Sequence, residues 1–172
     1  AEKVAAAVEE LKNDFGGSAV VLAQPEQSLP LLRKAYAAAS GNDRNIYAKV
    51  LAMLGDASGL EVLIEEVRNT AEWDKGWNYR GGGQFGHALS KLDTLIIGLG
   101  RTRDRRAVPV ILEKVKLLSA ESEFSHHRAA ALALELIGDP AAAKPLAELL
   151  NKPGMRGFVH RTIDDAKLHG VP

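Results

Sequence analysis

Hydrophobic and polar positions follow a helical period in three segments that align without gaps. The segments are DASGLEVLIEEV from Asp56, DRRAVPVILEKV from Asp104 and DPAAAKPLAELL from Asp139. In each segment, apolar residues follow the aspartate by four, seven and eleven positions, a spacing that places them on one face of a helix. The predicted core positions are Leu60, Leu63 and Val67, then Val108, Ile111 and Val115, then Ala143, Leu146 and Leu150.

The ends of these helices carry signals of their own. Each aspartate stands at an N-cap position, where its carboxylate can accept an unpaired backbone N–H. Another apolar segment precedes each aspartate: NIYAKVLAMLG, KLDTLIIGLG and RAAALALELIG. The glycines that end these segments, Gly55, Gly100 and Gly138, are predicted to adopt the left-handed conformation that ends a helix. Ser90 and Asp93 predict a capping box at the start of the second segment.

The repeated unit is therefore a helix, a Gly-Asp turn and a second helix. A degenerate copy begins at Pro25, another helix is predicted at residues 2–12, and a closing helix is predicted at residues 157–169. Because a helix pair cannot bury its apolar face alone, stacked pairs share one core. The sequence predicts an all-α fold, a single domain over residues 1–172, built as an α-solenoid of roughly four helix pairs.

The amino-acid composition argues against several classes of function. Lys plus Arg and Asp plus Glu number 22 each, so the chain lacks the basic excess typical of proteins that bind nucleic acid or anionic membranes. There is no cysteine, which excludes disulfides and thiolate metal sites. No apolar run approaches the roughly 20 residues that span a bilayer. The cellular compartment is left open by these features.

One long connection, residues 72–86, differs from the rest of the chain because it is rich in aromatic residues and glycine. Connections between packed helices usually have about 2–8 residues, and longer ones are often functional. Gly81, Gly83 and Gly86 match a dinucleotide-binding pattern, but no strand precedes them, so nucleotide binding is disfavoured, and backbone N–H groups that hold another anion stay an alternative. The aromatic side chains either cover the helical core or present a contact surface, and both alternatives stay open.

The candidate contact residues combine aromatic and basic side chains, which dominate binding hot spots. They are Trp73, Trp77, Tyr79, Arg80, Phe85, His87, Arg101 and Arg103. Arg101, Arg103, Arg105 and Arg106 could bind an anion or pair with acidic residues near their turn.

Two helical pairs have the spacing at which two side chains can share a metal ion. They are Glu123 with His127 and His160 with Asp164. Two ligands do not make a site, so no metal site is predicted. No arrangement of a nucleophile, a base and an orienting group is visible either, and neither catalytic residues nor a cofactor is predicted.

The Leu-Gly-Asp-x-x-Ala/Gly turns resemble the HEAT-like repeat of the phycobilisome-lyase type, over about residues 25–151. More narrowly, GWNYRGGGQFG, LGRTRDRRAVPVIL and LIGDPAAAKPLAELL resemble the C-terminal helical region of some bacterial FAD-dependent oxidoreductases. The second resemblance implies a non-catalytic appendage of an enzyme whose separate Rossmann-type domain holds the flavin.

The sequence thus favours a non-catalytic protein-interaction or scaffold module that uses its concave face and the 72–86 loop. Its partner would be another protein or an adjacent domain of the same polypeptide. One alternative is the helical accessory domain of a flavoenzyme. The other is a protein that handles a tetrapyrrole or another small ligand, with Trp77, Tyr79 and Arg80 contacting it.

Overall fold

Helices form every regular element in the described part of the chain, which confirms the predicted all-helical class. The computed structural model describes residues 2–13, 15–76 and 89–155. The α-helices are α1 (Glu2–Glu10), α2 (Ser18–Ala23), α3 (Pro25–Ala38), α4 (Gly41–Met53), α5 (Leu60–Asn69), α6 (Lys91–Arg101), α7 (Val108–Val115), α8 (Phe124–Ile137) and α9 (Ala143–Leu150). Short 3-10 turns precede three of them: η1 (Ala57–Gly59), η3 (Arg105–Ala107) and η4 (Pro140–Ala142).

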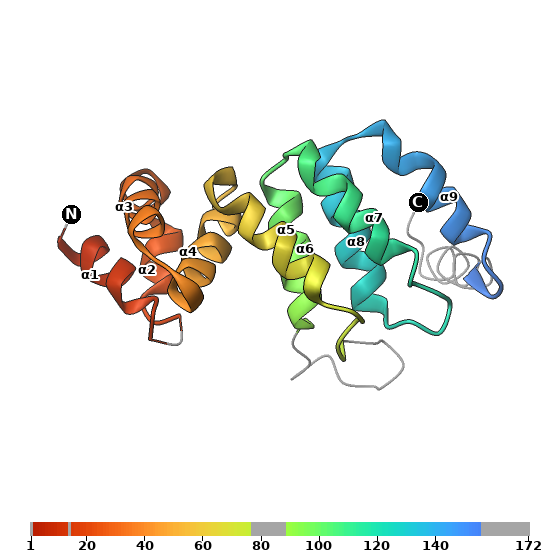
Figure 1. The fold of residues 1–172 in the computed structure, drawn as a ribbon, viewed down its shortest axis with the longest axis horizontal. Coiled ribbons are helices and arrows are strands. Elements are labelled where there is room, and N and C mark those ends of the chain that lie inside the picture. Colours follow the sequence, from red (N-terminus) through yellow and green to blue (C-terminus); the bar gives the residue numbers. More distant parts are fainter. Residues whose placement is uncertain (1, 14, 77–88, 156–172) are drawn as a thin grey trace, which may run out of the picture.

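The helices stack side by side along the long axis of the molecule, from α1 at one end to α9 at the other (Figure 1). From α4 onward they form two layers. Helices α4, α6 and α8 contact one another in order in the first layer, and α5, α7 and α9 do so in the second. The pair α6 and α8 has the most extensive contact.

The core consists of two clusters of buried apolar side chains. One lies among α1 to α4 and includes Leu11, Val21 and Leu32, while the larger one extends from α4 to α9. Tyr36 packs against both clusters and joins them. The core positions predicted for the first two aligned segments are all buried, as expected.

The third aligned segment is an exception. Leu150 is 47% exposed and Ala143 is exposed, so their assignment to the core is wrong, whereas Leu149 is buried. Leu146 is half-buried against the large cluster. Helix α9 is the last helix of the described residues and packs chiefly on α7, so it buries only a narrow face.

The three predicted aspartate caps are present. Asp56, Asp104 and Asp139 each accept the backbone N–H two residues ahead, at 2.9, 3.0 and 2.9 Å. Each cap begins a 3-10 turn, so the α-helix itself starts four residues after the aspartate. The alignment located the turns correctly but placed the helix starts too early.

The glycines that precede these caps do not all have the same role. Gly55 and Gly138 have φ values of 80° and 67°, as predicted. Gly100 lies within α6, and the left-handed position before the second cap, Asp104, is Arg103, with a φ of 56°. The predicted left-handed conformation of Gly100 is wrong. Glycine is needed there because α6 and α8 pack closely: an added Cβ would lie 2.3 Å from the Ala133 Cα.

A matched pair of substitutions in α6 tests this close approach. Gly100→Ala should lower the free energy of unfolding by about 1–3 kcal/mol, because the new methyl group overlaps α8. Gly98→Ala should raise it by about 0.5–1 kcal/mol, because its Cβ would lie 3.6 Å from the Ala52 Cβ and alanine favours a helix. Urea unfolding of both variants measures the two effects, and equal effects would contradict the assigned packing.

Candidate functional site

Residues 70–76, the anchor segment, form the described first part of the long connection and are held against the helices by Lys114 of α7. The Trp73 side chain is half-buried, and its Nε1 donates a hydrogen bond to the Lys114 carbonyl oxygen at 3.2 Å. The Lys114 ammonium in turn donates to the carbonyl oxygen of Thr70. Lys114 is buried, so the contact fixes the segment to the interior edge of α7.

The anchor segment also completes the start of α6. The carboxylate of Asp74 accepts the backbone N–H groups of Lys91 and Leu92, at 2.7 and 3.1 Å. Ser90 and Asp93 form the predicted capping box, in which each side chain accepts the backbone N–H of the other. The backbone N–H groups from Ser90 to Asp93 therefore all have an acceptor, although a helix start usually leaves several without an intrahelical partner.

Asp93 has a second role, because its carboxylate binds a histidine of α8. The His126 Nδ1 lies 2.8 Å from the Asp93 Oδ1, and the two side chains are 5% and 0% exposed. A carboxylate only accepts hydrogen bonds, so Nδ1 is the donor. His126 also makes an aromatic contact: its ring stacks on the Trp73 ring, with centroids 4.5 Å apart. Asp93, His126 and Trp73 thus link α6, α8 and the anchor segment.

Gly76 brings the backbone of the anchor segment directly onto the start of α8. A Cβ at this residue would lie 2.2 Å from the Ser125 Oγ and 2.6 Å from the His126 Cε1. The same point is 2.9 Å from the Glu123 Oε2. That oxygen is buried and has no hydrogen-bond partner among the described residues. Glycine is therefore required here by space alone.

Intramolecular contacts engage three of the four arginines near the second cap, Asp104. Arg101 donates to the carbonyl oxygen of Met53 at 3.1 Å, and Arg105 lies 3.8 Å from Asp139. Arg106 binds both Asp104 and Glu61 through its guanidinium, and its hydrogen bonds hold the pKa of Asp104 below the usual value. Arg103 is exposed. The contacts link turns of neighbouring helix pairs.

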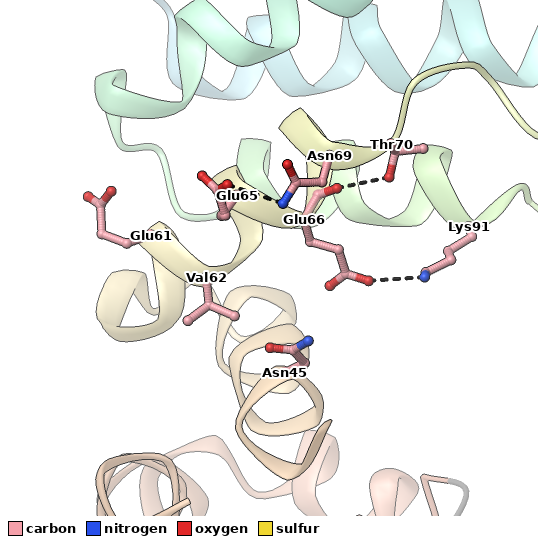
Figure 2. Close-up of a pocket in the computed structure, with 8 residues that line it drawn as sticks. All are labelled: Asn45, Glu61, Val62, Glu65, Glu66, Asn69, Thr70 and Lys91. Carbon is pink, nitrogen blue, oxygen red and sulfur yellow. Dashed lines mark hydrogen bonds and ion pairs between the residues drawn. The ribbon is translucent and has the colours of Figure 1, made fainter. Parts of the chain in front are cut away.

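A groove of about 610 Å³ opens between α4, α5 and the start of α6 (Figure 2). Its lining side chains are Asn45, Glu61, Val62, Glu65, Glu66, Asn69, Thr70 and Lys91. Figure 2 shows Asn45 on α4 facing Val62 and Glu66 on α5 across this space. Thr70 follows the last residue of α5 and Lys91 is the first residue of α6, so the groove adjoins both ends of the segment that joins these helices.

Glu66 of α5 contacts lysines from both of the other helices that line the groove. Its side chain is 15% exposed, and Oε1 accepts hydrogen bonds from Lys49 of α4 at 3.0 Å and forms an ion pair with Lys91 of α6 at 3.2 Å. Glu66 Oε2 is buried and lacks a hydrogen-bond partner within the described ranges. The contacts from both neighbouring helices fix the position of α5 at the floor of the groove.

The three predicted contact residues that the structure describes do not lie together on one surface. Trp73 lies beside the start of α6, whereas Arg101 ends that helix and Arg103 follows it. The 11 residues of α6 separate these groups by roughly 16 Å. The remaining predicted residues, Trp77, Tyr79, Arg80, Phe85 and His87, lie outside the described residues, as do the predicted closing helix and the pair His160 and Asp164.

The other pair with the spacing at which two side chains can share a metal ion is Glu123 and His127, for which no metal site was predicted. The His127 Nε2 hydrogen-bonds to the carbonyl oxygen of Ser119 at 3.0 Å. Burial lowers the pKa of His127, although the bond to Ser119 opposes this shift, so the neutral ring is favoured. Within residues 2–13, 15–76 and 89–155, no group of three or more potential ligands that could hold a metal ion is found.

The sequence analysis did not predict the groove, although the spacing of nearby residues in the sequence indicates part of its lining. Glu61, Glu65 and Asn69 recur every four residues on the polar face of a predicted helix, which places them side by side. Asn45 and Lys91 join them only through the packing of α4 and α6. The pairing of Asp93 with His126 likewise joins residues far apart in the sequence.

Replacing Asp74 tests the anchoring of α6. Burial alone would raise the pKa of Asp74, but the N–H groups of Leu92 and Lys91 outweigh it and lower the pKa overall. A carboxyl group whose pKa is lowered by folding stabilises the protein above its unfolded pKa, and this contribution is lost as the pH falls through the folded value. Asp74→Ala should therefore cost about 1–2 kcal/mol at neutral pH and less below about pH 4.

Urea unfolding at neutral and acidic pH measures this difference. Asp74→Asn is the comparison variant, because its amide does not titrate and its single oxygen can still accept one of the two N–H groups. A cost for Asp74→Ala that stays constant across the pH range would contradict the role of the charged carboxylate.

A double-mutant cycle tests the contact between Asp93 and His126. Asp93→Asn and His126→Gln should each destabilise the chain, and their effects should be non-additive by about 0.5–3 kcal/mol because the groups bind each other. Val8 belongs to the separate N-terminal cluster. The destabilising effects of His126→Gln and Val8→Ala should therefore add within about 0.5 kcal/mol. Additivity in the first cycle would show that the two side chains do not interact.

Comparison with known proteins gives one match. Residues 127–152 match the PBS lyase HEAT-like repeat family; they include most of α8, the capped turn at Asp139 and α9. None of the curated proteins and none of the solved structures matches the chain. In the described ranges, no helix has the length and apolar character needed to cross a membrane. The predicted resemblance to the HEAT-like repeat is thus confirmed over residues 127–152.

Proposed function

We propose that the chain is a non-catalytic protein-interaction module, an α-solenoid of roughly four helix pairs that forms a single domain. The groove between α4, α5 and α6 is its binding surface, and the adjoining 72–86 connection adds contacts. The partner is a segment of another protein or of another domain of the same polypeptide.

The observation that carries this proposal is the groove itself. Its lining comes from three successive helices, so its shape depends on the stacking of the pairs rather than on one loop. Extended surfaces of stacked helical pairs are the usual binding surfaces of repeat proteins. The HEAT-like repeat at residues 127–152 supports the same class of function. The flavoenzyme and tetrapyrrole alternatives rest on resemblance and composition alone.

Selection from a random peptide library displayed on phage, with the chain as bait, tests the proposal. Selected peptides should bind the wild-type chain and bind the Asn69→Trp variant about tenfold or more weakly. Residue 69 is exposed at the groove, so the indole of the variant can occupy the groove. Glu135→Trp is the matched control, because this exposed residue of α8 does not line the groove.

Circular dichroism and thermal unfolding of both variants verify that they fold. Failure to select any peptide would contradict the proposal. So would selected peptides that bind the wild type and Asn69→Trp equally.

A further inference from the structure

Acidic side chains outnumber basic ones among the residues that line the groove. Among its lining residues, Glu61, Glu65 and Glu66 are acidic and Lys91 is basic. Glu61 and Glu65 are one helical turn apart on α5, so their carboxylates lie on the same face. Their side chains are 72% and 56% exposed, which makes both accessible to a partner.

The cations that now pair with these two carboxylates are easily displaced. Glu61 pairs with Arg106 at 2.9 Å and Glu65 with Arg68 at 2.6 Å, and both arginine side chains are more than half exposed. Ion pairs between exposed side chains contribute little to stability, because solvent screens them and ordering two long side chains is unfavourable. A cation from a partner could therefore replace either arginine at small cost.

Glu66 differs from the two exposed carboxylates. It is mostly buried and is bound by lysines from both neighbouring helices, so it maintains the groove and is not available for exchange. Val62, half-buried between the acidic positions, offers an apolar surface. The methylene stem of a lysine or arginine can lie on such a surface while its charged end reaches a carboxylate.

We infer that the groove binds a basic segment of a protein partner, whose Arg or Lys side chains pair with Glu61 and Glu65 while their stems pack on Val62. This inference rests on the proposed binding function of the groove and adds the chemistry of its occupant. Nucleic acid is disfavoured as the occupant, because its phosphates would meet the same carboxylates.

Titration of the isotopically labelled chain with hexa-arginine, followed by amide chemical shifts, tests the inference. Hexa-arginine should shift the signals of α5 and of Lys91, and hexa-glutamate should not. The double variant Glu61→Gln, Glu65→Gln should lose about tenfold in affinity for hexa-arginine, and the loss should shrink at high salt. The matched control, Glu135→Gln with Glu148→Gln, changes the net charge equally at exposed positions outside the groove and should bind as the wild type does.

The outcomes separate this inference from the proposed function. Library-selected peptides that occupy the groove without enrichment in Arg or Lys, and that bind the Glu61→Gln, Glu65→Gln variant normally, would overturn the inference and leave the binding function intact. Equal losses in the two double variants would show non-specific attraction and overturn the inference as well. Groove binding by a single-stranded oligonucleotide would overturn it in favour of another class of partner. If no peptide reaches the groove, both proposals fail.

Discussion

A carboxylate taken completely out of water is destabilising by several kcal/mol unless donors replace the lost solvation. Asp93 is in this position, and its two donors belong to different helices: the N–H of Ser90 at the start of α6 and the Nδ1 of His126 on α8. The second bond fixes the ring of His126, which in turn sets the plane on which Trp73 stacks. The position of the anchor segment therefore depends on how one buried charge is satisfied.

The same helix pair meets a second constraint two turns further along. Gly100 approaches Ala133 closely, and both residues lie seven positions beyond Asp93 and His126 respectively. Seven residues are about two helical turns, so α6 and α8 run in parallel with one register along this length. A polar contact near one end and a steric contact near the other fix both the spacing and the register, which agrees with the extensive packing of this pair.

The sequence predicted those features of the fold that depend on neighbouring residues. The helices, the aspartate caps and the capping box of Ser90 and Asp93 all follow from local spacing and were found in the structure. Local spacing failed at Gly100, where the requirement for glycine comes from α8, and Arg103 takes the left-handed conformation instead. It failed again at Leu150, because helical period shows which residues share a face and not whether another helix covers it.

The candidate site was less predictable for the same physical reason. Aromatic composition drew attention to the long connection, and Trp73 could be singled out. Its partners His126 and Lys114 come from helices far along the chain, and no short-range pattern connects them. The groove is similar: α5 supplies the acidic row, which the sequence shows, whereas Asn45 and Lys91 close it only when three helices have stacked.

The glutamates around the groove differ in burial. The mostly buried Glu66 helps to set the shape of the groove, whereas the exposed Glu61 and Glu65 give its rim negative charge. The mostly buried carboxylate of Glu66 contacts Lys49 and the exposed Lys91, and these contacts link α5 to α4 and α6. At the rim, Glu61 and Glu65 would repel each other across one helical turn if both lacked a cation, and Arg106 and Arg68 relieve that repulsion when the groove is empty. Because both partners of those rim pairs are exposed, the pairs contribute little to stability, and a cation that replaced either arginine would leave the contacts of the mostly buried Glu66 unchanged.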